Sequence, residues 1–322
     1  MRIALITPAA AHTRNGNRNT ATRWAAFLRE AGHRVAVMQH WNCGDADVLI
    51  ALHARRSHDS IARYAERFSD RPLVVVLTGT DLYRDLPGDA HAQGSLAAAT
   101  RLVVLQDAAL DAIDAIAPAF RSKTRVIYQS ARAIERSPPL QSCFEIVVNG
   151  HLRMEKDPFR AAAAAAHLPP ESRIRITHVG RALTAETEAD AHAWVAREPR
   201  YRWRGELPHS RALRVLARSR AMVISSRMEG GANVVSEALT IGVPVIASDV
   251  SGNIGMLGRD YPGYYAVGDE RALARVLART ERDSGFYAVL EASCRARAAL
   301  VTPERERAAL ESLIAEVTPG RA

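Results

Sequence analysis

Two glutamates and a pair of glycines occupy one stretch of the chain, AMVISSRMEGGANVVSEALTIGVPVIASDVSG (residues 221–252). Its pattern predicts a strand, a tight polar loop, a helix and a second strand. Gly230 and Gly231 have no Cβ, so the loop backbone can come close to a ligand. The helix is expected to open around Ala232–Val234, and its free amides, together with the positive end of the helix dipole, could hold a phosphate.

The two carboxylates lie on either side of this helix start. Glu229 is in the loop, whereas Glu237 is about five residues into the helix, or roughly 7.5 Å along its axis. One carboxylate could therefore reach a sugar beside the phosphates while the other reaches hydroxyls further along the same ligand. Singly, each is better explained as a loop carboxylate or a surface helix residue. Their occurrence together with the glycines favours a shared ligand.

One lysine is unusual because arginine dominates the chain. Only two of the 43 basic residues are lysines, Lys123 and Lys156. A surface cation here would most often be arginine, so Lys156 favours a specific point charge, such as one on a diphosphate. A capping or solvated lysine is the alternative.

The elements that must position these residues follow a repeating α/β pattern. Helical patterns such as Thr22–Glu30 separate short apolar runs, which indicates a parallel sheet with helices on both faces. In the first part of the chain the predicted strands are Arg2–Thr7, His33–His40, Val48–His53, Leu73–Thr78, Leu102–Gln106 and Thr124–Gln129.

The pattern begins again after the polar segment Ser137–Ser142, the best linker candidate. We therefore predict an α/β chain of two doubly wound, Rossmann-like domains, residues 1–142 and 143–322, facing a central cleft at the carboxyl ends of both sheets. The helical segments Glu270–Thr280 and Pro303–Val317 are assigned to the second domain. Its predicted strands are Phe144–Asn149, Arg173–Val179, Tyr201–Arg204, Ala221–Ser225, Pro244–Asp249 and Tyr264–Val267.

Composition limits the class of protein. With 322 residues, 48% hydrophobic and 24% charged, the chain can bury substantial cores, which excludes a disordered or fibrous protein. No apolar run reaches the roughly 18 residues of a membrane helix, and the opening MRIALITP does not resemble a signal peptide. The three cysteines are odd in number and far apart, which indicates reduced thiols and a cytoplasmic protein.

The net charge of +8 raises the question of nucleic-acid binding. Aromatic residues are only 6% of the chain and no nucleic-acid-binding motif is present. We therefore interpret the charge as attraction for small phosphorylated anions. No metal-ligand motif is visible, and His53 and His58 lack a ligand pattern, so neither a metal nor another cofactor is expected.

The two chemistry-bearing segments resemble the retaining glycosyltransferases of the GT-B fold, in the group called family 4. Their Glu-x7-Glu element matches Glu229 and Glu237, and their Gly-Arg-Leu…Lys-Gly element is matched in part by residues 150–157, with His151 in place of arginine. The resemblance implies that Glu229 contacts the donor sugar, that Glu237 binds the nucleotide ribose, and that Lys156 and Arg153 act on the diphosphate. The donor-binding set it implies is His151, Gly230, Gly231, Ala232, Asn233, Val234, Val235 and Glu237.

The whole chain is also similar to the SenB family of selenosugar synthases from selenoneine biosynthesis. The similarity lies in blocks such as ITPAAAHTRNGNRNTATRWA (Ile6–Ala25), VVLTGTDLYRDL (Val75–Leu86) and GNIGMLGRDYPGYY (Gly252–Tyr265). It implies a reaction in which a UDP-sugar, chiefly UDP-N-acetylglucosamine, and selenophosphate form a 1-selenosugar with release of UDP and phosphate. Such an anionic nucleophile needs cations and hydrogen-bond donors more than a general base. Candidates in the first domain are Asn15, Arg18, Asn19, Thr20, His53, Arg55, Arg56, Thr78 and Thr80.

Structural explanations stay open for several of these residues. Asn19 or Thr20 could cap the helix that follows, and Arg55 and Arg56 could be a solvated pair. His53 could be a satisfied histidine at a strand end. Asp81 is expected to cap the next helix, although it could instead orient a loop or act as a base.

Other functions also stay open. Many family 4 enzymes have His-Gly where this chain has Thr78-Gly79, so the usual assistance to the sugar does not transfer. A conventional glycosyltransferase with a hydroxyl or thiol acceptor is the main alternative, and an inactive UDP-sugar-binding or nucleic-acid-binding protein is a second. A lipid acceptor is disfavoured because the helix Thr22–Glu30 has few basic residues. The partners expected are small-molecule substrates, with no nucleic acid or membrane, and the oligomeric state is not predicted.

Overall fold

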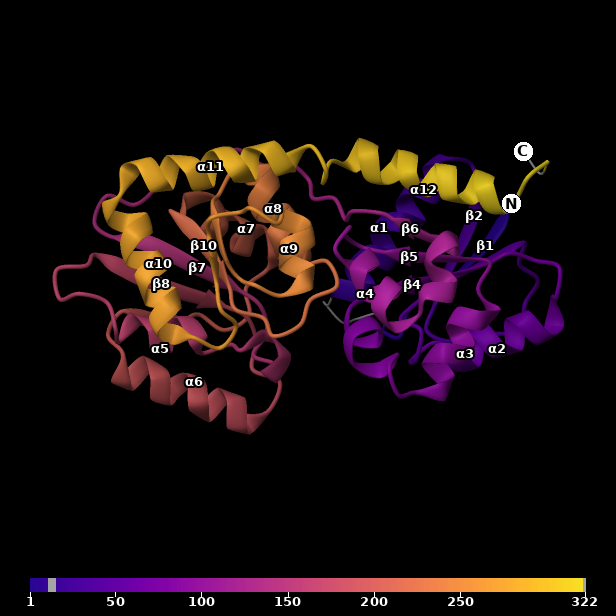
Figure 1. Cartoon of the computed structure of the whole chain (residues 1–322), viewed down its shortest axis with the longest axis horizontal. Coiled ribbons are helices and arrows are strands. Elements are labelled where there is room, and N and C mark those ends of the chain that lie inside the picture. Colours follow the sequence, from indigo (N-terminus) through magenta and orange to yellow (C-terminus); the bar gives the residue numbers. More distant parts are fainter. Residues whose placement is uncertain (11–15, 321–322) are drawn as a thin grey trace. The chain divides into compact units, whose positions relative to one another are not determined.

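The apolar runs of the first part of the chain form a six-stranded parallel sheet in the computed structural model, which describes residues 1–10 and 16–320 (Figure 1). The strand order is β2-β1-β3-β4-β5-β6. Every pairing is parallel, and β1 lies between β2 and β3 with Ile3 opposite Val35 and Val48. The strands are β1 (Arg2–Ile6), β2 (Arg34–Met38), β3 (Val48–Leu52), β4 (Leu73–Leu77), β5 (Arg101–Val104) and β6 (Thr124–Val126).

Helices cover both faces of this sheet because successive residues of a strand point to opposite sides. Ile50 of β3 belongs to the core beneath α1 (Gly16–Glu30) and α12 (Pro303–Val317), whereas its neighbour Leu49 belongs to the core on the other face. The second core includes side chains of α2 (His58–Arg67), α3 (Ala90–Ala98) and α4 (Ala109–Ile116). The π-helical turn η1 (Asp81–Asp85) and the 3-10 helix η2 (Pro118–Lys123) lie in connections of the same unit.

A second six-stranded parallel sheet has the order β12-β11-β10-β7-β8-β9. Its central strand, β7 (Phe144–Asn149), is flanked by β8 (Ile174–Val179) and β10 (Ala221–Ile224). The remaining strands are β9 (Tyr201–Trp203), β11 (Val245–Ser248) and β12 (Tyr264–Tyr265). The sheet order reverses direction between β7 and β10, which is where ligands bind in open sheets of this kind.

The helices of the second unit are α5 (Arg160–Ala165), α6 (Ala185–Arg197), α7 (His209–Arg218), α8 (Asn233–Ile241), α9 (Ser251–Leu257), α10 (Glu270–Arg282) and α11 (Ser284–Ala298). Helix α5 has four fully buried alanines, whose small side chains let it pack with α10 in the core of this sheet. Helix α7 packs on β7, and α8 lies beside α7 and α11.

The division of the chain differs from the predicted boundary at residues 142 and 143. Unit 1 comprises Met1–Ser130, Glu229–Ala232 and Pro303–Ala322, and unit 2 comprises Ala131–Met228 and Asn233–Thr302. The terminal helix α12 therefore belongs to unit 1 and not to the second domain. It does so because Leu310, Leu313 and Ile314 are buried in the core that also contains Trp24.

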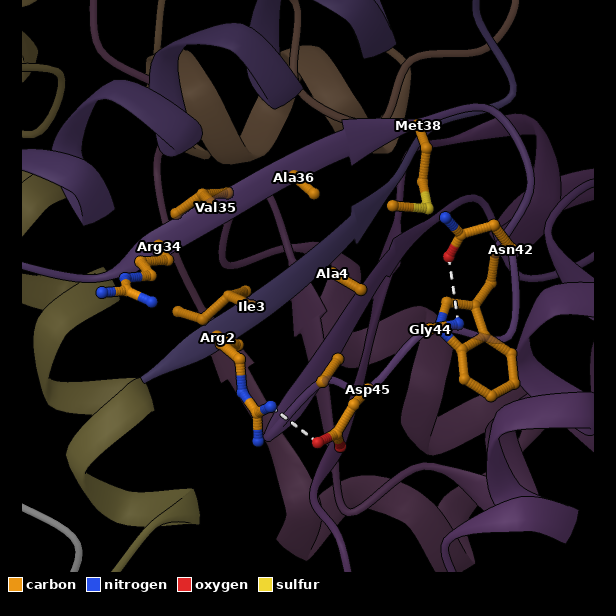
Figure 2. A pocket seen from close by; sticks show the side chains of 12 residues that line it. Arg2, Ile3, Ala4, Arg34, Val35, Ala36, Met38, Asn42, Gly44 and Asp45 are labelled. Carbon is orange, nitrogen blue, oxygen red and sulfur yellow. Dashed lines mark hydrogen bonds and ion pairs between the residues drawn. The ribbon is translucent and has the colours of Figure 1, made fainter.

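A cavity of about 340 Å³ opens along β1 and β2 in unit 1 (Figure 2). Arg2, Arg34, Met38, Trp41 and Asp45 are among its lining residues, and Arg2 forms an ion pair with Asp45 at 2.6 Å. None of the predicted site residues lines it. The candidate site must therefore be sought at the strand ends.

Candidate active site

In unit 2 the predicted phosphate-binding helix is present. Helix α8 begins at Asn233, as expected, and buries Val235, Ala238 and Leu239. This burial holds the first turn of the helix, with Asn233, Val234 and Val235, at the carboxyl end of β10. The backbone amides of this first turn have the orientation and partial charge that suit an anion.

Four residues of the preceding loop group with unit 1, although the chain on either side belongs to unit 2. They are Glu229, Gly230, Gly231 and Ala232, and Glu229 is buried. A Cβ on Gly230 would lie 2.3 Å from the carbonyl oxygen of Thr78, and one on Gly231 would lie 2.6 Å from Leu105 Cβ. The structure therefore shows a reason for these glycines that we did not predict, which is close packing of the protein backbone on itself.

Glu237 lies on α8 and has a histidine partner. The Nε2–H of His209, the first residue of α7, donates to Glu237 Oε1 at 2.8 Å. The Glu237 side chain is 15% exposed, whereas that of His209 is 64% exposed. The hydrogen bond orients the carboxylate while leaving it in reach of solvent, as a group that binds a ligand hydroxyl would be.

The loop after β7 carries Lys156, and it is tied to the end of β10. Ser225 Oγ donates to the carbonyl oxygens of Lys156 and Asp157, at 3.1 and 2.9 Å, and the amide of Arg227 donates to the carbonyl of Glu155 at 2.9 Å. Asp157 has a φ of +45°, which turns the chain sharply after Lys156. The structure thus brings together the two segments that the sequence singled out in unit 2.

Arg153 and His151 lie in the same loop. The Arg153 Nε is buried and has no hydrogen-bond partner among the described residues, and its guanidinium is 3.9 Å from Glu155. His151 Nδ1 accepts from the amide of Arg181 at 3.1 Å, so this imidazole holds the loop that follows β8. Arg153 is the residue that keeps an uncommitted guanidinium nitrogen here.

A buried histidine, His178, forms a hydrogen bond to the start of this loop. The Nε2–H of His178 donates to the carbonyl of Gly150 at 3.0 Å, and its Nδ1 accepts from the hydroxyl of Tyr201 at 2.8 Å. Burial lowers the pKa of His178 to about 4, so the ring is neutral at neutral pH. Gly180 completes the contact, because a Cβ there would lie 1.8 Å from the Gly150 oxygen.

In unit 1 the ends of β3 and β4 meet, as neighbouring parallel strands require. His53 follows β3 and is buried, and its Nε2 lies 3.0 Å from the hydroxyl of Thr80, which follows β4. Asp81 orients this loop, since its carboxylate accepts from the amides of Ala54, Thr78 and Gly79. Asp81 is the first residue of η1, and the N-cap position is that of Thr80, whose side chain makes no capping hydrogen bond, so the expected capping role of Asp81 is wrong.

The candidates Arg18, Asn19 and Thr20 lie in a helix that begins before the predicted start at Thr22. Helix α1 begins at Gly16, so Arg18, Asn19 and Thr20 lie within its first turns and neither Asn19 nor Thr20 is an N-cap. Thr20 is buried, donates to the carbonyl of Gly16 at 2.9 Å and accepts from Gln129. Asn15 lies outside the described residues.

The two arginines after β3 differ from each other. Arg55 forms an ion pair with Asp89 at 2.7 Å, so it has a structural partner. Arg56 is exposed, and its backbone amide donates to His53 Nδ1 at 3.3 Å. Thr78 is half-buried beside Asp81.

Three side chains at these sites were missed by the sequence analysis. They are His209, which pairs with Glu237, and Asp85 and Arg84, which lie beside His53 and pair with each other at 3.0 Å. The only signal for them in the sequence is that each follows a predicted strand or begins a helix. Such a position does not identify a partner far away in the sequence.

Metal sites and membrane-spanning helices are both absent from the part of the chain that the structure describes. Among residues 1–10 and 16–320 there is no group of three or more His, Cys, Asp or Glu side chains arranged to hold a metal ion. No helix in the same part of the chain combines the length and apolarity needed to cross a bilayer.

Comparison with solved structures shows the fold. HepE of Anabaena, solved with UDP and glucose, superposes with a TM-score of 0.75 at 16% identity, over 98% of this chain and 100% of that chain. Sucrose-phosphate synthase of Thermosynechococcus elongatus gives a TM-score of 0.78 at 18% identity over 98% of both chains. The predicted GT-B architecture of two parallel-sheet units is confirmed.

Sequence comparison identifies the family of the chain. A glycogen synthase of Mycobacterium tuberculosis is 35% identical over 115 residues, which cover 34% of this chain and 26% of that enzyme. The aligned region is thus about a quarter of the relative's length. The family model described as "Glycosyl transferases group 1" matches residues 133–297, just over half of the chain, including the Lys156 loop and both glutamates. The chain belongs to the group 1 glycosyltransferases.

Proposed function

We propose that the chain transfers a sugar from a UDP-sugar. One observation carries this proposal: the loop of Lys156 is fastened by Ser225 and Arg227 to the end of β10, which leads into Glu229 and the first turn of α8. A cation, a helix start and two carboxylates are what a nucleotide diphosphate bearing a sugar requires. The solved structures with this fold include HepE with UDP and with UDP-glucose.

In this proposal Lys156, Arg153 and the amides of Gly230–Val235 stabilise the negative charge that develops on the leaving diphosphate. Preorganised donors of this kind often supply the largest part of catalysis. Glu229 contacts the donor sugar and Glu237 the ribose. Transfer is proposed to need no metal ion, and undiminished turnover in excess EDTA is the expected result.

We further propose that the acceptor is selenophosphate and the donor chiefly UDP-N-acetylglucosamine. The bond between the anomeric carbon and the diphosphate oxygen breaks, and a carbon–selenium bond forms. Water then cleaves the selenium–phosphorus bond, so that UDP, phosphate and a 1-selenosugar are released. Support comes from the sequence blocks Ile6–Ala25 and Val75–Leu86 and from the hydroxyl and arginine groups at the ends of β3 and β4.

The second candidate is transfer to a hydroxyl or thiol acceptor. It is favoured by the names of the similar proteins, a glycogen synthase and a sucrose-phosphate synthase. The donor half of the site is common to both candidates, so only the acceptor distinguishes them.

An anaerobic assay of UDP release from UDP-N-acetylglucosamine tests both. The second substrate is selenophosphate, thiophosphate, phosphate or a simple alcohol, and mass spectrometry identifies the product. We expect release with selenophosphate and a selenium-bearing sugar, both lost in Glu229→Ala and Arg18→Ala. Release only with alcohols would assign the conventional activity, and no release with UDP binding intact would contradict both acceptor proposals.

A further inference from the structure

The ends of β3 and β4 hold a polar cluster whose proton positions can be assigned. Its members are His53, Thr80, Asp81 and Asp85. His53, Asp81 and Asp85 are all buried, whereas Thr80 is half-buried. Thr80, Asp81 and Asp85 lie in or beside the π-helical turn η1. Such turns are rare in proteins as a whole, and those that occur are often at functional sites.

The backbone fixes the tautomer of His53. The amide of Arg56 donates to Nδ1 at 3.3 Å, so Nδ1 carries a lone pair and no proton. Burial lowers the pKa of His53, so the ring is neutral and its single proton is on Nε2. Carboxylate oxygens of Asp81 and Asp85 lie 3.9 Å from Nδ1 and Nε2 respectively, so the two carboxylates balance and the Arg56 amide decides the tautomer.

The direction of the hydrogen bond to Thr80 follows from the tautomer. The Nε2–H of His53 donates to the Thr80 oxygen at 3.0 Å, so the hydroxyl accepts this bond and keeps its own proton for another acceptor. Among the described residues the structure shows no acceptor for that proton. A hydroxyl that accepts a bond also becomes a stronger donor, because bonds in a chain polarise one another.

The charges around the cluster indicate which ligand would accept this bond. Beyond burial, the carboxylates of Asp81 and Asp85 raise the pKa of His53, whereas the positive charges of Arg56 and Arg84 lower it. Both carboxylates are buried, Asp81 against backbone amides and Asp85 against Arg84, so the exposed charges are those of the two arginines. A hydroxyl donor beside two arginines suits an oxyanion such as a phosphate group.

We propose that Thr80 donates a hydrogen bond to an oxyanion of the acceptor substrate, and that His53 is a positioning residue that fixes this donor without touching the acceptor. This inference rests on the proposed function, because it names the acceptor class at the same site. It replaces the expectation from sequence that His53 binds the acceptor directly. The buried ring instead acts through the half-buried hydroxyl.

Binding of inorganic phosphate and of thiophosphate, measured by isothermal titration calorimetry, tests the proposal. Thr80→Val keeps the shape of the side chain and removes the hydroxyl, and we expect about a tenfold or greater rise in the phosphate Kd. Thr80→Ser restores the donor and should restore binding. Thr100→Val serves as the control, because Thr100 Oγ1 accepts from Leu73 N at the opposite edge of the sheet, and its loss should not change the Kd.

His53 is tested by a pair of variants and a double-mutant cycle. His53→Asn suits the φ of +73° but cannot reach Thr80, whereas His53→Gln places an amide N–H near the position of Nε2. We expect a rise in Kd of roughly two- to tenfold for Asn and recovery for Gln. In the Thr80→Val background His53→Asn should have no further effect, because His53 acts through that hydroxyl.

Three results would overturn the inference. They are unchanged phosphate binding in Thr80→Val, an undiminished effect of His53→Asn in the Thr80→Val background, and a wild-type protein that binds UDP but neither anion. The last result leaves the proposed donor function standing. Phosphate binding without UDP binding would instead support the anion site and count against the proposed function.

Discussion

Among single residues, the two carboxylates of the proposed donor site are held in different ways. Glu237 accepts from His209 and stays in reach of solvent, whereas Glu229 is buried next to two glycines that pack on the backbone of Thr78 and on Leu105. The cations differ as well. Lys156 lies in the 3-10 helix η3 (Met154–Lys156), and the neighbouring Arg153 keeps an unpaired Nε. Variants of Glu237 and Lys156 test the proposed roles of one carboxylate and one cation.

Replacing Glu237 with alanine should weaken UDP binding about tenfold, because a charged acceptor for the ribose hydroxyls is lost. His209→Ala should weaken it only about two- to threefold, since this exposed histidine orients the carboxylate without binding the nucleotide. Calorimetry with UDP and with its 2′,3′-dideoxy analogue checks this. Wild type should prefer UDP, and Glu237→Ala should bind the two almost equally. An equal loss for both ligands would contradict a ribose contact.

Replacing Lys156 with glutamine should lower kcat by about 100-fold with a smaller change in KM for the UDP-sugar, because the charge matters most as the diphosphate departs. Lys156→Arg should recover part of the loss. The other lysine gives a matched control: Lys123 donates to the carbonyls of Leu96 and Ala99 in unit 1, so Lys123→Gln should affect stability and leave kcat unchanged. A kcat for Lys156→Gln within threefold of wild type would assign Lys156 to structure.

Among the secondary-structure elements, hydrogen bonds from neighbouring residues hold the loops of the proposed site in place. The loop after β7 is held on one side by Ser225 and Arg227 at the end of β10, and on the other by His178 of β8. The loop after β4 is held by the carboxylate of Asp81. Strand ends alone would leave these loops free, so the supporting polar groups are part of the site.

The buried His178 predicts a pH dependence of stability. Its pKa is about 4 in the folded chain and near 6.5 when unfolded, so the unfolded chain binds the proton more tightly. The contribution of the neutral His178 to the free energy of unfolding is therefore fully present above about pH 6.5. It is lost as the pH falls toward 4, by about 3 kcal/mol in all. Between pH 7.5 and 5 the unfolding free energy measured with urea should fall by roughly 2 kcal/mol less in His178→Gln than in wild type.

His192→Gln is the control for this experiment, because His192 is an exposed histidine of the same unit. It should show the pH dependence of the wild type. If His178→Gln lost stability over this range as steeply as wild type, the ring would not be the group that resists protonation.

In the whole chain, unit 1 is built from distant parts of the sequence. Helix α12 packs its Leu310, Ile314 and neighbouring residues under the same sheet as α1. Glu306 of α12 is buried and accepts from Trp24 Nε1 at 2.7 Å, from the Arg23 guanidinium and from the amide of Ser130 at 2.8 Å. Helix α12 therefore completes unit 1.

Removing residues 303–322 should unfold unit 1 and spare unit 2. Four buried apolar side chains (Leu310, Leu313, Ile314 and Val317) are lost, worth about 6–12 kcal/mol, as large as the stability of a typical domain. Limited proteolysis with mass spectrometry should show rapid cleavage within residues 1–130 and protection of residues 131–228 and 233–302. A chain ending after Thr318, which keeps α12 whole, should resist cleavage like wild type. Equal resistance of the shorter chain would contradict this account of unit 1.

The sequence by itself determined the strand segments and the parallel α/β class, and it singled out the two segments of the proposed donor site. This was possible because apolar runs, glycines and helix starts are recognised from residues that are close together in the sequence. Glu229, Glu237 and Lys156 also occur in a recognisable spacing. The same local rules predicted that α8 starts around Ala232–Val234, and the structure confirms this with a start at Asn233.

Only the tertiary structure decided which residues are buried and which are partners. It moved α12 into unit 1, extended α1 over Arg18–Thr20, buried His53 behind Thr80, and paired His209 with Glu237. Each of these depends on contacts between residues far apart in the chain. Hydrophobic burial has no direction and no fixed sequence separation, so the local pattern does not specify it. Hydrogen-bond partners follow from that packing, since buried polar groups must bond to whatever the fold brings near.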